Sequence, residues 1–332
     1  MFFNQKGHSM KNLPLISICV CTYNGDKYLE EQLKSLINQD YPNFEIVIVD
    51  DRSTDTTYQI LERFAAEHTN IHIYQNPNNL GYIKNFEKAI SLSNGDLITL
   101  CDQDDLWESN KLSILFSRFD SSSILIYHNS NLIDEKNSFL NKTLAQSIGY
   151  INGNNHVALF LNNCVAGHAM MFRKDLVLKI LPFPENIPHD HWIAYVALHN
   201  GYLQFLDLCL VNYRQHNFSV TYTHHLEKKQ TSIFEDKLEK RREIKNLRIK
   251  HLHTLLKYPL NTEADVIIIQ NLIRYLSARD DHYFSFSMFF YFLRHQKRLF
   301  ELYHKSFLSN ASLIYKECIG QKAKVFWNNI GL

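Results

Sequence analysis

Several features that would place a protein in a membrane or outside the cell are missing from this sequence. No apolar run is long enough to cross a bilayer, and the apolar start, Phe2 and Phe3, is too short for the core of a signal peptide. The six cysteines are scattered, without the spacing of a zinc site or a disulfide framework. We therefore expect a cytoplasmic protein in a reducing compartment.

Neither a charge excess nor a glycine-rich phosphate loop is present. With 35 basic and 34 acidic residues the formal net charge is +1, so no overall field favours nucleic acid as a partner. The 10 glycines form neither the dinucleotide-binding pattern nor the Walker pattern. Phosphates of a bound nucleotide would therefore need a metal ion and cationic side chains. The 332 residues are 45% hydrophobic, which is ample for a globular core.

The first third of the chain alternates strand and helix patterns. Continuously apolar segments, typical of parallel strands, are separated by segments with apolar residues at helical spacing. The predicted strands cover residues 16–21, 44–49, 71–74 and 96–101, and the predicted helices cover residues 28–37, 54–64 and 85–92. This order predicts an α/β fold with an open, mostly parallel central sheet and helices on both faces. Ligands of such sheets bind beyond the carboxyl ends of the strands.

The rest of the chain changes character near residue 225. Strands are predicted at residues 124–127, 165–172 and 202–213, and a short helix at residues 191–199. The later part is helical, with helices predicted at residues 226–256 and 265–276, followed by an aromatic and basic segment at residues 283–302. We therefore predict a first domain at residues 1–225 and a helical C-terminal region at residues 226–332.

Two carboxylates, Asp102 and Asp104, follow the fourth predicted strand. Clustered carboxylates repel one another unless a cation lies between them. A small number of oxygen ligands suits Mg²⁺ or Mn²⁺ that also binds phosphate oxygens. The alternative is a solvated acidic turn, or caps for a helix that begins near Glu108, for which Asp105 is the natural candidate.

A second pair of carboxylates, Asp50 and Asp51, ends the second predicted strand. An aspartate at a strand tip can accept hydrogen bonds from a ribose hydroxyl or a base N–H group. Part of this loop is structural in our interpretation, because Ser53 or Thr54 can cap the next helix.

Four motifs in this order carry a family resemblance. They are Ile18-Cys-Val-Cys-Thr-Tyr-Asn24, Val49-Asp-Asp-Arg-Ser-Thr-Asp55, Asn79-Leu-Gly-Tyr-Ile-Lys-Asn85 and Cys101-Asp-Gln-Asp-Asp-Leu-Trp107. Together they resemble glycosyltransferase family 2, which has the Rossmann-like GT-A fold, over about residues 14–220. The last motif is similar to that of bacterial rhamnosyl- and galactosyltransferases of surface polysaccharide synthesis. The resemblance implies inverting, metal-dependent transfer of a hexose or deoxyhexose, with rhamnose or galactose favoured. The implied donor is a UDP- or dTDP-sugar, and the implied acceptor is a glycan or lipid-linked glycan.

The resemblance also implies roles for single residues. Thr22 and Tyr23 would line the nucleobase pocket, and Asp104 would be the main metal ligand. Lys84 stands where the family often has an arginine, which keeps the charge but loses the bidentate fork. The implied nucleotide-sugar contacts are Thr22, Tyr23, Asn24, Asp50, Asp51, Lys84, Asp102, Gln103 and Arg214. The implied ligands of Mn²⁺ or Mg²⁺ are Asp102, Asp104 and His216.

Asp190, in the sequence Pro188-His-Asp-His-Trp192, matches the position of the family's general base. Inversion needs a base that takes the proton of the acceptor hydroxyl as its oxygen attacks the anomeric carbon. The alternative is an N-cap, since Asp190 precedes an apolar helix. Upstream, Gly167 and His168 lie in a segment similar to an acceptor-side loop, where Gly167 would permit close approach of a sugar.

On this interpretation, nucleotide-sugar binding falls at about residues 14–120 and the acceptor side at about residues 121–225. The segment 284–302 combines aromatic and basic residues, which suits either an anionic membrane surface or packing on the catalytic domain. The expected place is then the cytoplasm, at the inner face of the cell membrane, and the C-terminal helices could also mediate a homodimer. Two rival functions are transfer to a protein or peptide acceptor and a degenerate module that only binds glycans or nucleotides.

Overall fold

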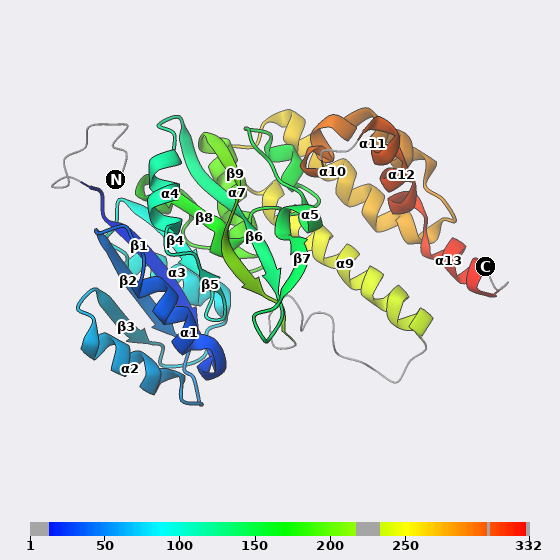
Figure 1. Ribbon diagram of the computed structural model, residues 1–332. Helices are drawn as coiled ribbons and strands as arrows, with labels where there is room; N and C mark the ends of the chain where they lie inside the picture. Colours follow the sequence, from blue (N-terminus) through cyan, green and yellow to red (C-terminus); the bar gives the residue numbers. More distant parts are fainter. Residues whose placement is uncertain (1–12, 217–232, 304–305, 330–332) are drawn as a thin grey trace. The chain divides into compact units, whose positions relative to one another are not determined.

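The computed structural model describes residues 13–216, 233–303 and 306–329. The chain divides into two compact units (Figure 1). The first contains residues 1–145 and 165–214, and the second contains residues 146–164 and 215–332. The predicted domain boundary near residue 225 lies outside the described residues. The assignment of residues 146–164 to the second unit was not foreseen.

One nine-stranded sheet forms the centre of the first unit. Its strands are β1 Ile16–Thr22, β2 Phe44–Asp50, β3 Ile71–Gln75, β4 Leu97–Cys101, β5 Leu106–Trp107, β6 Ser123–Ile133, β7 Phe139–Thr143, β8 Met170–Arg173 and β9 Tyr202–Arg214. Their order is β3-β2-β1-β4-β8-β6-β9-β5, with β7 paired to β6.

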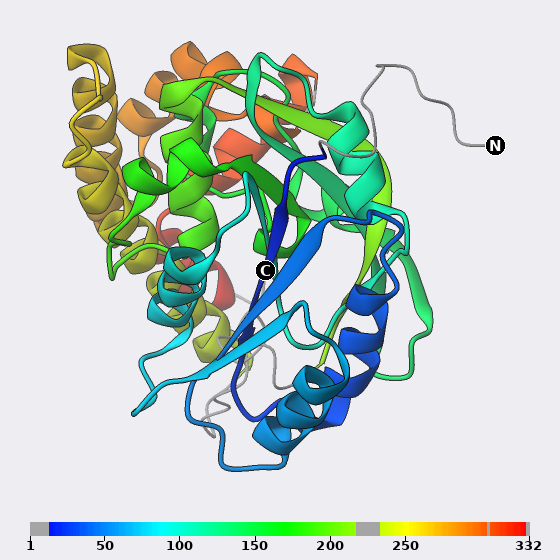
Figure 2. The same cartoon turned by 90° about the vertical axis from the view of Figure 1, so that its left-hand side faces the viewer.

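The described residues up to 216 also contain seven α-helices. They are α1 Asp26–Ile37, α2 Thr57–Glu67, α3 Tyr82–Leu92, α4 Lys111–Arg118, α5 Leu144–Ile148, α6 Val177–Ile180 and α7 His189–Asn200. Within the first unit, α1 and α2 cover one face of the parallel strands and α3 lies on the other face (Figure 2). The four strands and three helices predicted for the first third are thus confirmed.

The point at which the strand order reverses indicates where a ligand would bind. β1 pairs in parallel with both β2 and β4, so the chain runs outward to β3 and then returns to the other side of β1. In open α/β sheets this switch point leaves a crevice at the carboxyl ends of the two central strands. Here that edge is formed by the residues that follow β1 and β4, and we refer to it as the crevice.

Beyond β4 the sheet is mixed. β8 is antiparallel to both β4 and β6, whereas β6 and β9 are parallel. The α/β class is confirmed, but parallel pairing prevails only among the first four strands. The strand predicted at residues 165–172 begins at Met170, because Gly167–Ala169 forms a short 3-10 turn.

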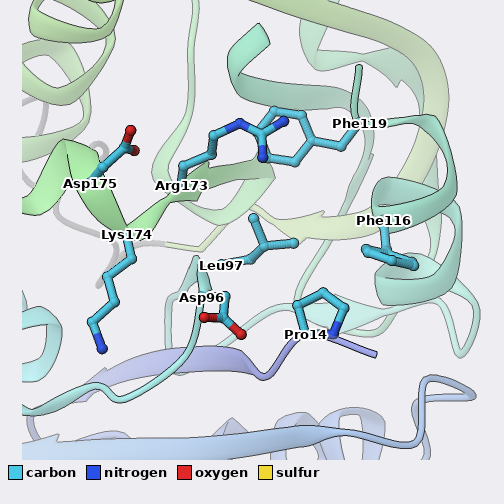
Figure 3. A pocket seen from close by; sticks show the side chains of 8 residues that line it. All are labelled: Pro14, Asp96, Leu97, Phe116, Phe119, Arg173, Lys174 and Asp175. Atoms are coloured by element: carbon cyan, nitrogen blue, oxygen red, sulfur yellow. The ribbon is translucent and has the colours of Figure 1, made fainter. Parts of the chain in front are cut away.

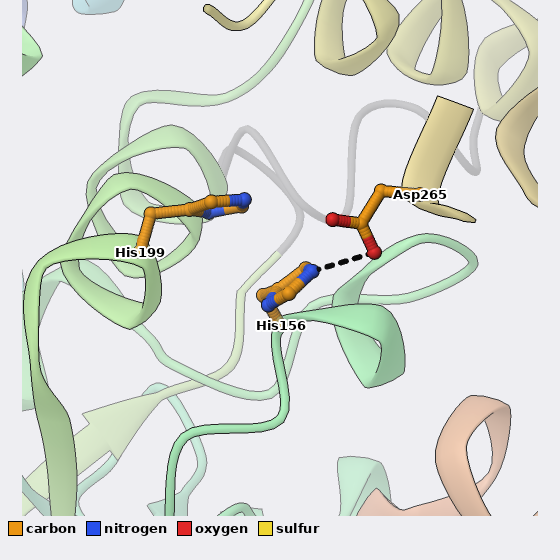
Figure 4. A group of neighbouring side chains, drawn as sticks. All are labelled: His156, His199 and Asp265. Carbon is orange, nitrogen blue, oxygen red and sulfur yellow. Dashed lines mark ion pairs between the residues drawn. The ribbon is translucent and has the colours of Figure 1, made fainter. Parts of the chain in front are cut away.

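The second unit is helical. Its elements are the 3-10 helix His156–Leu159, α9 Ile233–Leu256, α10 Glu263–Ala278, the 3-10 helix Arg279–Asp281, α11 Phe286–Leu299, the 3-10 helix Glu301–Tyr303, α12 Phe307–Cys318 and α13 Gln321–Asn329. Polar contacts tie residues 146–164 to these helices. His156 forms an ion pair with Asp265 of α10 at 2.9 Å (Figure 4), and the backbone N–H of Tyr150 donates to the carbonyl of Leu302 at 3.0 Å. Among the described residues, no helix has the length and apolarity needed to cross a membrane.

Candidate active site

The ends of β1 and β2 are joined by the carboxylate of Asp50. The Thr22 hydroxyl donates to Asp50 at 3.0 Å, as do the backbone N–H of Ser53 and the side-chain amide of Gln75. Asp50 is fully buried, so these donors satisfy a carboxylate that water does not reach. Ser53 thus donates to Asp50. The first residue of α2 is Thr57, so neither Ser53 nor Thr54 caps this helix.

Asp51 fixes the loop that leads into α3. Its carboxylate accepts backbone N–H groups of Leu80 and Gly81, each at 2.8 Å, and the side-chain amide of Asn76 at 2.7 Å. Gly81 has φ of 80°, a conformation that favours glycine. The Asn79-Leu-Gly motif is therefore held against the end of β2 by Asp51. Contacts of Asp50 and Asp51 with the donor stay predictions.

Gln103 links the loop after β4 to the loop after β1. Its side-chain amide accepts the backbone N–H of Tyr23 at 2.8 Å and donates to the Tyr23 carbonyl at 3.0 Å. A Cβ atom added to Gly25 would lie 2.2 Å from Gln103 Oε1, so a larger residue would displace this amide. The Tyr23 side chain is left 45% exposed, while the Asn24 side chain accepts the backbone N–H of Thr54. Gln103 thus holds the backbone of Tyr23 beyond the end of β1, while the Tyr23 ring stays exposed.

Asp102, Asp105 and His168 converge beyond the end of β4. Nδ1 of His168 lies 3.9 Å from Oδ2 of Asp102 and 3.6 Å from Oδ2 of Asp105. Nε2 of His168 is hydrogen bonded to the Ser130 hydroxyl at 2.9 Å, and its ring stacks on Tyr213 at 4.5 Å. Burial lowers the pKa of His168 to about 3, with the nearby Lys111 charge as a further cause, so the imidazole is neutral at pH 7.

The carboxylates differ in their surroundings. Asp105 is fully buried, and the backbone N–H of Arg214 donates to its Oδ1 at 3.0 Å. Burial is the main cause that raises the Asp105 pKa well above its usual value. Although 42% of the Asp102 side chain is exposed, desolvation by the packed protein raises its pKa to about 7, and the negative charges of Asp104 and Asp190 add to this.

A buried lysine lies beneath this cluster. Lys111, the first residue of α4, donates to the backbone carbonyl of His168 at 2.6 Å and lies 3.1 Å from the centre of the Trp107 ring. The prediction that Asp105 caps the next helix is wrong, because α4 starts at Lys111 with Asn110 as its N-cap. Asp105 instead anchors the end of β9 and faces His168.

Asp190 approaches the same crevice from the first turn of α7. The helix begins at His189 after Pro188 as the N-cap, so Asp190 is not the N-cap but a carboxylate of the first turn, where it also interacts favourably with the helix dipole. Burial raises the pKa of Asp190 to about 6, although backbone N–H groups, including that of Gly167, lower it in part. A Cβ atom on Gly167 would lie 3.1 Å from Nε2 of His189, which shows how closely the 3-10 turn approaches α7.

Tyr82, which the sequence analysis did not single out, lies near both Asp102 and Asp190. Its ring meets the edge of His189 at 5.8 Å, and 37% of the residue is exposed. Burial raises the Tyr82 pKa to about 12, and the charges of Asp190 and Asp102 contribute. The only sequence signal was its position after Gly81 in the Asn79-Leu-Gly motif.

The two predicted phosphate contacts are engaged with protein groups. Lys84 forms an ion pair with Glu87 at 3.0 Å. Arg214 is 1% exposed; its Nε donates to the Asp104 carbonyl at 2.8 Å and its guanidinium pairs with Glu31 at 3.2 Å. Arg214 therefore supports the acidic loop from behind. His216 belongs to the second unit, so its predicted metal contact stays a prediction.

The acidic crevice has the donor set that a hard divalent cation requires. One ligand atom from each of Asp102, Asp105 and His168 lies within 4.8 Å of the others. Oδ2 of Asp105 is buried and finds no hydrogen-bond donor among the described residues. Two carboxylate oxygens and a neutral imidazole fit Mn²⁺ or Mg²⁺. Asp105 and His168 thus join the predicted Asp102 and Asp104 as possible ligands.

A separate pocket lies at the opposite edge of the sheet, where β1 and β4 begin (Figure 3). Its volume is about 330 Å³, and Pro14, Leu97, Phe116 and Phe119 form its apolar part. Arg173 on its rim donates to backbone carbonyls of Ser123 and Asp120, each at 3.0 Å. The charged rim is thus occupied by structural contacts, and the acidic crevice remains the candidate site.

A mixed α/β sheet with carboxylates beyond its switch point is an arrangement that can bind a phosphorylated ligand through a metal ion. Residues 17–181 match the family described as Glycosyl transferase family 2. An uncharacterised glycosyltransferase of Haemophilus influenzae is 26% identical over 67% of this chain and 72% of its own length. A dTDP-rhamnosyl transferase of Shigella flexneri is 37% identical over 36% of this chain and 46% of its own length. The protein is a glycosyltransferase and belongs to family 2.

Solved structures support the same fold. TarS of S. aureus, residues 1–349 in complex with UDP-GlcNAc, aligns with a TM-score of 0.54 at 22% identity. The alignment covers 87% of this chain and 79% of the TarS chain. The predicted GT-A fold with a helical C-terminal region is confirmed.

Proposed function

We propose that this glycosyltransferase transfers a hexose or deoxyhexose, with rhamnose or galactose favoured, from a UDP- or dTDP-sugar to a glycan or lipid-linked glycan. The Shigella relative is named for dTDP-rhamnose transfer and TarS was solved with UDP-GlcNAc, which supports a pyrimidine nucleotide donor. Synthesis of a cell-surface polysaccharide at the inner face of the cell membrane is the setting proposed for this reaction.

One observation carries the proposal. Asp102 follows β4 and Asp190 lies in the first turn of α7, yet Asp190 accepts the backbone N–H of Gly167, and the next residue, His168, lies 3.9 Å from Asp102. The two carboxylates therefore lie near one another, although they come from different elements of the first unit. A donor bound at Asp102 and an acceptor bound at Asp190 would meet between them, which is the arrangement that direct displacement with inversion requires.

In the proposed reaction, Asp190 accepts the proton of an acceptor hydroxyl. The oxygen of that hydroxyl forms a bond to the anomeric carbon while the bond from this carbon to the diphosphate oxygen breaks, and its electron pair leaves with the diphosphate. Because the pKa of Asp190 is about 6, the carboxylate is mostly ionised at pH 7 yet still basic enough to take a proton.

The leaving diphosphate carries charge that the crevice must neutralise. Asp102 and Asp104, with His216 as a further proposed ligand, would hold Mn²⁺ or Mg²⁺, and the metal would neutralise that charge when bound. Asp105 and His168 are the alternative ligands offered by the structure. Thr22, Tyr23, Asn24 and Gln103 would surround the nucleoside.

Donor turnover tests the proposal. Purified protein is incubated with UDP-, dTDP- and GDP-sugars, with Mn²⁺ or with chelator, and nucleotide release and thermal shift are followed. We expect metal-dependent release from one donor, loss of release in Asp190→Asn, and no change in the control Asp175→Asn at the opposite edge of the sheet. Binding without turnover would favour the degenerate module, and transfer to a peptide would favour a protein acceptor.

A further inference from the structure

Helix α11 in the second unit presents two faces of different chemistry. Met288, Phe292, Gln296 and Leu299, spaced by three or four residues, are buried. The opposite face is exposed and carries Phe286, Phe290, Arg294 and Lys297 at the same spacing, which we call the aromatic–basic stripe. Buried packing therefore explains one face of α11 and leaves the stripe unexplained.

The aromatic half of the stripe is large. Phe286 is 68% exposed and Phe290 is 65% exposed. The two rings belong to a surface group, because Phe284 lies 4.9 Å from Phe286 and 5.2 Å from Tyr315 of α12, and Phe289 lies 5.6 Å from Phe290. An exposed group of aromatic rings of this kind marks an interaction surface rather than scattered apolar residues.

Basic residues outnumber acidic ones along this stretch of the chain, which follows Asp280 and Asp281. Between residues 283 and 316 the described part of the chain holds four basic residues, Arg294, Lys297, Arg298 and Lys316, and one acidic residue, Glu301. The Glu301 carboxylate accepts a hydrogen bond from Asn155, so it is directed to a neighbour within its unit. The next acidic residue, Glu317, is paired with Arg248 at 3.2 Å.

We propose that the aromatic–basic stripe docks this enzyme on an anionic lipid bilayer, with the phenyl rings in the interface and the basic side chains at the lipid phosphates. Aromatic rings partition into the headgroup region, and lysine and arginine beside them gain from the negative surface. A protein partner would need no such separation of rings and charges along one helix. The proposal rests on the proposed function in one respect only, which is that docking would give the enzyme access to a lipid-linked acceptor.

Vesicle sedimentation of the full chain tests the proposal. The vesicles are phosphatidylcholine alone or phosphatidylcholine with phosphatidylglycerol, at low and at physiological salt. We expect binding to the anionic vesicles and at least tenfold weaker binding to the neutral ones. Each basic residue near an anionic surface contributes about fivefold, so Arg294→Gln with Lys297→Gln should weaken binding about 25-fold and reduce its salt dependence.

The aromatic contribution is tested by Phe286→Ser with Phe290→Ser, which should weaken binding at least tenfold. Leu178→Ser in the first unit is the matched control, because Leu178 is 89% exposed and should leave vesicle binding unchanged. Circular dichroism confirms that each variant is folded. Donor hydrolysis without vesicles should be the same in all of these proteins, which separates docking from the proposed chemistry.

Three results would overturn the proposal. One is absence of vesicle binding by the unmodified chain. Another is unchanged vesicle binding by the double phenylalanine variant, because the rings would then not contact the bilayer. A loss of thermal stability in the same variant would show that the rings serve packing instead. The third is a concentration-dependent dimer that the same variant converts to a monomer while vesicle binding persists, which would make the stripe a contact between two copies of the chain.

Discussion

Replacement of Asp190 by asparagine should lower the rate of the reaction and raise the stability of the folded protein. The two effects can be measured separately. If Asp190 is the base, Asp190→Asn should lower kcat/KM by about 10²- to 10⁴-fold. In the unmodified enzyme kcat/KM should fall about tenfold for each pH unit below about 6, because protonation removes the base. The variant should lack this acidic limb. The assay is nucleotide release at saturating metal between pH 5 and pH 8.

The same substitution has a worked effect on stability. Burial raises the pKa of Asp190 from 3.8 to about 6, so the folded state binds a proton more tightly than the unfolded state. Stability is therefore lost as pH rises from about 4 to about 6, and the loss totals about 3 kcal/mol above that window. Asp190→Asn avoids this loss. It should be more stable than the unmodified protein by up to about 3 kcal/mol at pH 8 and by less at pH 5.

Urea denaturation at both pH values measures this difference, and Asp175→Asn serves as the surface control. The reasoning about Asp190 fails if the variant keeps the acidic limb of the pH profile. It also fails if the stability difference between variant and unmodified protein is the same at pH 5 and pH 8.

The remaining predictions concern the support of the crevice. Asp104→Asn should raise the Mn²⁺ concentration needed for half-maximal activity at least tenfold, and an unchanged metal titration would remove Asp104 from the ligand set. Lys111→Met should lower the free energy of unfolding by about 1–3 kcal/mol, because the buried His168 carbonyl loses its donor; an unchanged urea midpoint would contradict this. Asp51→Asn should cost about 1–3 kcal/mol, since an amide cannot accept every N–H of the loop at Gly81; a raised donor KM without loss of stability would instead identify Asp51 as a donor contact.

Local pattern was sufficient for the regular elements. β1 and β2 are continuously apolar because both faces of a parallel sheet are covered, and this pattern marked them to within a residue. Helix α7 was found nearly in full, because its residues form a long apolar run that is buried in the structure. β7 was missed, since four of its five residues are exposed and carry no apolar alternation. β5 has two residues, too few for any periodicity.

The sequence by itself determined the α/β class, the family and the positions of Asp102 and Asp190, because these depend on short motifs and on the period of apolar residues. Only the tertiary structure decided which groups meet. Asp105 faces His168 across 63 positions of sequence, and Lys111 donates to a carbonyl 57 residues away. Such contacts depend on strand order, which local periodicity does not encode, since β4 pairs with β8 from a later part of the chain. The same packing desolvates Asp105 and Asp190 and thereby raises their pKa values. These shifts depend on the surroundings and do not follow from the residue type alone.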